Sequence, residues 1–142
     1  MVADSIRYSQ PIHPVHAVLA SSALPLFLGA LLSDWAYSSS YEIQWTNFAS
    51  WLIAGALVFV GLALLWAVVD GLRADTDRHR SRWIHIGLLG ATFGVGFINA
   101  LVHARDAWAA MPAGLILSIL CFLLALAAVW TGFSSHRQGD PR

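Results

Sequence analysis

Charged residues are scarce in this 142-residue sequence, in which Asp, Glu, Lys and Arg together make up 11% of the chain. A soluble domain usually carries about 25% charged residues. Hydrophobic residues account for 58% of the sequence, and the mean hydropathy is +0.64. This composition excludes an ordinary soluble domain and predicts an integral membrane protein.

Cysteine is almost absent as well. Cys121 is the single cysteine, which excludes an internal disulfide, a CxxC redox motif and a c-type haem attachment site. The formal net charge is +0 and no basic run is interleaved with aromatic residues, so nucleic-acid binding is not expected. A phosphate-binding glycine loop, a nucleophile elbow and an HExxH zinc motif are also missing. The sequence therefore leaves open whether the protein is an enzyme.

Four apolar segments lie at about 15–37, 46–69, 83–104 and 111–133. Each has the ~20 residues that a helix needs to cross a bilayer. They predict one all-α domain over residues 1–142, an integral membrane four-helix bundle of two antiparallel helical hairpins. A polar N-terminal segment (1–12), a charged loop (70–82) and a C-terminal tail (134–142) flank the helices. "WAVVDGLR" at 66–73 and "WTGFSSHR" at 130–137 close the two hairpins alike and leave an internal repeat open.

The arginines are distributed unevenly between the two sides that four spans create. The side with both termini and the 70–82 link carries Arg7, Arg73, Arg78, Arg80, Arg82, Arg137 and Arg142, and the other side carries Arg105 alone. Loops rich in arginine and lysine stay in the cytoplasm. We therefore expect a multi-pass protein of the cytoplasmic (inner) membrane, with both termini in the cytoplasm.

Ionisable residues recur at the same spacing on the first and third segments. His16 precedes Asp34 by 18 residues, and His85 precedes His103 by 18 residues. Eighteen residues are five helical turns, or about 27 Å of rise. Each pair should therefore lie on one helix face, near opposite membrane surfaces.

The residues between these pairs indicate which face is internal. Polar side chains form a stripe along the third segment that continues near the outer ends of the first and third segments. Its members are Asp34, Thr92, Asn99, His103 and Arg105. The matching face of the first segment is mostly small, with Ala20, Ala23, Phe27 and Ala30. A polar stripe facing lipid would be costly. Both faces should line the bundle interior, and Asp34 and His103 should meet there as a mutually charged pair.

The chain resembles a family of prokaryotic membrane proteins called domain of unknown function 2231. The resemblance rests on "HPVH" at 13–16, "VVDG" at 68–71 and "WIHIGLLG...INALVHARD" at 83–106, and it covers about residues 11–133. The HPxH start is its most specific element. The resemblance implies a four-helix membrane architecture and no agreed activity.

Four interpretations of the histidines remain open. Two imidazoles at one depth, His16 and His85, could bind haem b as axial ligands for electron transfer to or from a quinone or a redox protein. A divalent metal ion could instead be held by His13, His16, Asp70 and His85. A third interpretation is a proton or ion path along Asp34, His103, Asn99 and Thr92. The last is a non-catalytic membrane subunit with interfacial histidines, in which Asp34 pairs with Arg105. From the sequence we favour electron transfer through haem b.

Overall fold

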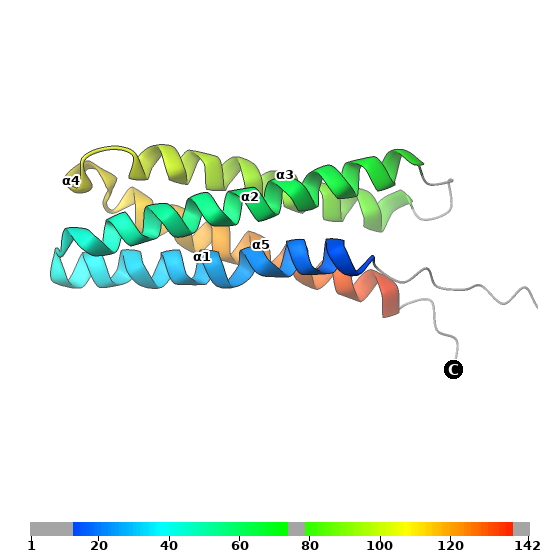
Figure 1. Ribbon diagram of the computed structural model, residues 1–142, viewed down its shortest axis with the longest axis horizontal. Coiled ribbons are helices and arrows are strands. Elements are labelled where there is room, and N and C mark those ends of the chain that lie inside the picture. The colour runs from blue at the N-terminus through cyan, green and yellow to red at the C-terminus, as the bar shows by residue number, and fades with distance from the viewer. Residues whose placement is uncertain (1–12, 74–78, 138–142) are drawn as a thin grey trace, which may run out of the picture.

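The computed structural model describes residues 13–73 and 79–137, and five helices occupy these two ranges (Figure 1). The helices are α1 (Pro14–Ser40), α2 (Ile43–Arg73), α3 (His79–His103), α4 (Ala107–Ala110) and α5 (Ala113–Arg137). Neither described range contains a β-strand. The four long helices confirm the all-α prediction, whereas the single turn of α4 has no counterpart among the predicted segments.

The ends of α1 follow from local chemistry. Pro14 occupies the first turn, where a missing amide N–H costs no helical hydrogen bond. The His13 ring caps the helix, because its Nδ1 accepts a hydrogen bond of 3.3 Å from the Val15 amide. Tyr41 adopts the left-handed conformation with φ 56°, and its amide donates to the Tyr37 carbonyl. This turn ends α1 and allows α2 to begin almost at once.

The 70–82 link, predicted as a loop, is mostly helical. α2 continues to Arg73 and α3 begins at His79, so only residues 74–78 of the link lie outside the described residues. Hydropathy detects the part of a helix that lies in hydrocarbon, and polar helix ends continue beyond that boundary. Arg73 lies in the last turn of α2, where a cation interacts favourably with the helix dipole. His79 belongs to this charged link and is predicted to be a surface residue, and its side chain lies outside the described part of the chain.

The four long helices form one bundle (Figure 1). α1 packs against α2 and α5, and α3 packs against the same two helices. α1 and α3 therefore face each other across the bundle diagonal. The hairpins α1–α2 and α3–α5 are antiparallel, so α1 and α3 run in the same direction.

The core of the bundle follows a heptad pattern on every long helix. Buried positions alternate at spacings of three and four residues, as in Thr46, Ala49, Ile53, Ala56, Val60, Ala63 and Ala67 of α2. The same alternation runs through α1, α3 and α5. This spacing is typical of left-handed four-helix bundles with knobs-into-holes packing. Most of the buried residues are alanine, glycine or serine, which lets the helices approach closely.

Large hydrophobic side chains lie on the outside of the bundle. Exposed examples occur on all four long helices and include Leu32, Val58, Leu65, Phe97 and Leu123. Soluble proteins rarely expose so much apolar surface. Four helices are long and apolar enough to cross a membrane: Pro14–Ser40, Ile43–Arg73, Arg80–His103 and Ala113–Ser134. Helices in lipid associate through small residues, which explains why alanine fills the core while leucine faces outward.

Phe27 is the largest fully buried side chain among the described residues. Its ring packs in the middle of the bundle against Gly96, where an added Cβ would lie 3.3 Å from the Phe27 Cζ. Ala23, Ala56 and other small residues surround it. One aromatic ring therefore fills the space that these small side chains leave.

Phe27→Ala should open a cavity that the surrounding alanines cannot refill. We expect it to lower the free energy of unfolding by about 3 kcal/mol. Phe97→Ala is the matched control, because Phe97 is 51% exposed on the same bundle and should change little. Equilibrium unfolding of both variants in mixed micelles measures the difference. Equal losses for the two variants would contradict this description of the core.

Candidate functional site

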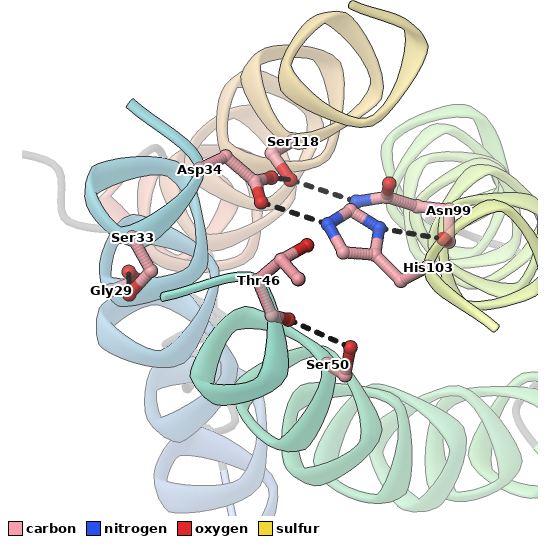
Figure 2. A network of polar contacts seen from close by, with 8 residues as sticks. All are labelled: Gly29, Ser33, Asp34, Thr46, Ser50, Asn99, His103 and Ser118. Carbon is pink, nitrogen blue, oxygen red and sulfur yellow. Dashed lines mark hydrogen bonds and ion pairs between the residues drawn. The ribbon is translucent and has the colours of Figure 1, made fainter. Parts of the chain in front are cut away.

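Each of the four long helices contributes a buried polar side chain to one layer of the core. These side chains come from Asp34 on α1, Thr46 on α2, His103 on α3 and Ser118 on α5, and Asn99 lies one turn from His103 (Figure 2). We call these five residues the Asp34 layer. Asp34, Asn99 and Ser118 are 0% exposed. A carboxylate so deeply buried needs hydrogen-bond donors around it.

The Asp34 carboxylate receives its hydrogen bonds from two other helices. His103 Nε2 lies 2.8 Å from Asp34 Oδ1, and the Ser118 hydroxyl donates to Asp34 Oδ2 at 2.5 Å. Ser118 in turn accepts from Asn99 Nδ2 at 2.9 Å. His103 Nδ1 lies 3.0 Å from the Asn99 carbonyl oxygen, which closes the network on α3 (Figure 2). The predicted approach of Asp34 and His103 inside the bundle is confirmed.

The partners of His103 determine where its protons lie. A carbonyl oxygen can only accept, so we assign a proton to His103 Nδ1, which donates to Asn99. The contact between Nε2 and Asp34 Oδ1 then holds one further proton. That proton can belong to an imidazolium beside a carboxylate, or to a carboxyl group beside a neutral imidazole. Both arrangements leave the pair with no net charge inside the bundle.

Ser118, His103 and Asp34 do not form a nucleophilic triad. In such a triad the histidine takes the proton of the serine hydroxyl and the carboxylate orients the histidine from its other nitrogen. Here the Ser118 hydroxyl donates to the carboxylate itself, and His103 Nδ1 is bound to a backbone carbonyl. The imidazole is therefore not placed to take the proton of the Ser118 hydroxyl. The chemistry that this layer supports is proton binding.

A second layer lies near the other end of the bundle and contains two histidines. His16 Nε2 lies 3.2 Å from His85 Nε2, with the rings nearly perpendicular. His85 Nδ1 lies 3.0 Å from the Ala128 carbonyl oxygen, so by the same argument it carries a proton. In the neutral pair, His16 Nε2–H therefore donates to His85 Nε2. We call His16, His85, Ala128 and Gly132 the His16 layer.

The Asp34 layer and the His16 layer have similar arrangements of hydrogen bonds. In each, an α3 histidine binds a backbone carbonyl through Nδ1 and reaches across the diagonal through Nε2 to a residue 69 positions earlier on α1. Each histidine also packs on a glycine of α5. A Cβ at Gly114 would lie 2.8 Å from His103 Cε1, and one at Gly132 would lie 3.0 Å from His85 Cε1. A side chain at Gly114 would displace the His103 ring, and one at Gly132 would require the His85 ring to move by a few tenths of an ångström.

The four residues predicted to bind a metal are not assembled into one shell. His13 caps α1 and its ring stacks on Trp66 with centroids 4.8 Å apart, while Asp70 is exposed. Only His16 and His85 meet. Among the side chains that the structure describes, no three His, Cys, Asp or Glu residues are grouped so that they could hold a metal ion.

The His16 layer does not fit haem b in this arrangement. Axial imidazoles bind on opposite sides of the iron, and two metal–imidazole bonds of about 2 Å place the nitrogens about 4 Å apart. The two nitrogens are 3.2 Å apart and in direct hydrogen-bond contact. The adjoining cavity has a volume of about 10 Å³, roughly the size of one water molecule. A macrocycle would require α1 and α3 to separate.

The predicted polar stripe is buried except at its end. Asn99 and His103 belong to the Asp34 layer, and Thr92 is buried but donates at 2.7 Å to the Leu88 carbonyl of its own helix. Arg105 is exposed in the turn after α3 and is not part of the stripe. Asp34 therefore pairs with His103 and not with Arg105, because α3 ends at His103 and the chain turns outward.

Sequence reasoning missed the α2 and α5 members of the layers. Ser118 is the only polar side chain apart from Cys121 and Trp130 within the apolar run 113–130, and that isolation is a signal. Gly114 and Gly132 repeat the 18-residue spacing of the two α3 histidines. Thr46 is the first residue of the apolar segment 46–69, and it also begins the heptad series of buried residues on α2.

The fold and these layers define a class: a four-helix membrane-spanning bundle with ionisable side chains that are buried near one end and half-buried near the other. The chain belongs to the family described as Predicted membrane protein (DUF2231), whose model matches residues 12–136. The resemblance noted from the sequence is thereby confirmed. No curated protein and no solved structure matches the chain.

The Asp34–His103 pair should show strong energetic coupling. Asp34→Leu or His103→Leu alone leaves the other group buried without its partner, which costs about 3–5 kcal/mol. The double variant removes both charges and should cost far less than the sum. Chemical unfolding of the three variants gives the coupling energy. Asp106→Leu, at an exposed site, is the control. Additive losses would show that the two side chains do not interact.

Proposed function

We propose that this protein is a proton-handling membrane protein, in which the Asp34–His103 pair binds and releases protons. The observation that carries the proposal is the 2.8 Å contact between His103 Nε2 and a carboxylate that is 0% exposed. Ionisable groups inside membrane proteins are costly and are functional candidates by default.

Stability alone is a poor explanation for this pair. An apolar pair of similar volume often stabilises a core as well as a buried ion pair does. The rest of the core is built from alanine and other small residues, so an apolar layer would suit this bundle. A pair that shares one proton offers what an apolar layer cannot, which is a site where a proton can be added or removed.

The proposed proton-binding site is confined to the Asp34 layer and is not part of a continuous proton path along the bundle. The Asp34 and His16 layers are 18 residues apart on α1 and on α3, which is about 27 Å along the axis. Phe27, Ala23, Ala30 and Ile53 are 0% exposed between them, and the Thr92 hydroxyl is bound to its own helix. Protons should therefore enter and leave each layer from its own end of the bundle.

The arginine distribution supports an orientation for these two ends. It favours an orientation with both termini and the His16 layer at the cytoplasmic surface of the inner membrane, and the Asp34 layer near the opposite surface. In a Cys121→Ala background, Glu42→Cys should react with a membrane-impermeant maleimide applied to intact cells. Arg142→Cys should react only after the membrane is opened. The reverse labelling pattern would invert the proposed orientation.

Infrared difference spectroscopy tests proton binding directly. If the resting pair is an imidazolium beside a carboxylate, the C=O stretch of a protonated buried carboxyl group should appear reversibly when the pH is lowered without unfolding the protein. If it is a carboxyl group beside a neutral imidazole, the band should be present from the start. Asp34→Asn should remove this band, and Asp106→Asn, at an exposed site, should retain it. A band that never appears in the folded protein would show that the pair has a structural role only.

Haem b electron transfer through His16 and His85, with a quinone or a redox protein as partner, stays a prediction that the same preparation tests. A Soret band and a sharp α-band on reduction, both lost in His16→Ala and in His85→Ala, would favour haem. A colourless protein is the result expected from proton handling.

A further inference from the structure

Thr46 is the member of the Asp34 layer whose hydroxyl has no role in the hydrogen-bond network. Its Oγ1 is buried and has no hydrogen-bond partner. Figure 2 shows this oxygen pointing toward the hydrogen bond between Asp34 and His103. A buried hydroxyl without a partner costs about 1–3 kcal/mol.

This orientation is unusual for the chain. Most described hydroxyl groups donate to a carbonyl in the preceding turn of their own helix, and these are Ser22, Ser33, Ser38, Ser39, Ser40, Ser50, Thr92, Thr131 and Ser134. Thr46 could satisfy its hydroxyl in the same way. It turns the hydroxyl into the layer instead.

Thr46 also lies close to the end of the bundle at which His103 ends α3. It is the fourth residue of α2, and both of its neighbours in the chain, Trp45 and Asn47, are exposed. The residue keeps 8% of its surface exposed although the hydroxyl oxygen itself is buried. On the other side of the layer, Ala30 and Ala49 form a fully buried apolar cluster with Ile53. Apolar side chains thus close the layer toward the bundle centre, so a proton exchanged with solvent has to enter from the helix ends, where Thr46 lies.

We propose that Thr46 is a relay residue that passes protons between solvent and the Asp34–His103 pair. A hydroxyl group can accept a proton on one lone pair while it donates its own, so it suits this step. To exchange a proton with Asp34 Oδ1 or His103 Nε2, the Thr46 hydroxyl first forms a hydrogen bond to the pair that the resting structure does not contain. On its other side it exchanges a proton with a water molecule at the end of α2. No bond to carbon changes, and the hydroxyl returns to its starting state.

The test measures solvent exchange of the His103 ring proton on Nε2, by ¹⁵N NMR of histidine-labelled protein in lipid nanodiscs. Thr46→Val keeps the shape and removes the hydroxyl, and it should slow exchange by tenfold or more, on the order of the contribution of a positioned proton-transfer group. Thr46→Ser should restore the rate. Ser50→Ala is the matched control, because that hydroxyl only donates to the Thr46 carbonyl at 2.9 Å.

Two further measurements separate the outcomes. Thr46→Val should leave the thermal midpoint unchanged or raise it, because it removes an unsatisfied polar group. Unchanged exchange in Thr46→Val, together with faster exchange in Asp34→Asn, would overturn the relay while leaving the proposed function intact. Exchange that is insensitive to Asp34→Asn would instead overturn the proposed function on which the relay rests.

Discussion

The hydrogen bond between His103 and Asp34 is the interaction on which the rest of this arrangement depends. It joins α1 and α3, which lie on the bundle diagonal, at a point where neither group can reach water. This buried contact depends on the neighbouring residues. Ser118 supplies a second hydrogen-bond donor to the carboxylate, and Asn99 holds both Ser118 and the imidazole in place. Gly114 has no side chain and so leaves room for the imidazole. The small residues of the core allow the helices to approach closely enough for these contacts.

The His16 layer repeats this design with a different chemistry. A second imidazole stands where the carboxylate stands in the Asp34 layer, and the same 69-residue separation joins α1 to α3. The Asp34 pair is neutral with one shared proton, whereas the two imidazoles become positively charged when they share an extra one. The two ends of the bundle therefore differ in charge behaviour although they share geometry. The apolar segment around Phe27 keeps them separate.

Much of this could be predicted from the sequence, because helical periodicity fixes which residues share a face. The 18-residue spacing on two segments predicted both diagonal pairs, and the polar stripe predicted the interior face of α3. That two residues lie at the same depth in the membrane, however, does not determine how close their helices are. His16 and His85 meet directly, in contact too close for the iron of a bis-imidazole haem. Ser118 and Thr46 were missed because their helices carry no ionisable residue in the layer, and only the register between helices brings them to Asp34.

Hydropathy likewise predicted the spans but not their full lengths, since helices such as α2 extend beyond the apolar segment to Arg73. The heptad alternation of small residues was present in the sequence as well, and it would have indicated Gly114 and Ser118 as core positions. Reading the small residues as a pattern, and not only the large apolar ones, is what this type of membrane bundle requires.

The nitrogen chemical shifts of the His103 ring report whether His103 shares a proton with Asp34 inside the bundle. In ¹⁵N solid-state NMR of the lipid-embedded protein, Nδ1 should be protonated and Nε2 should show a strong hydrogen bond that Asp34→Asn alters and Asp106→Asn does not. An unprotonated His103 Nδ1, or nitrogen shifts that Asp34→Asn leaves unchanged, would show that the two side chains do not share a proton.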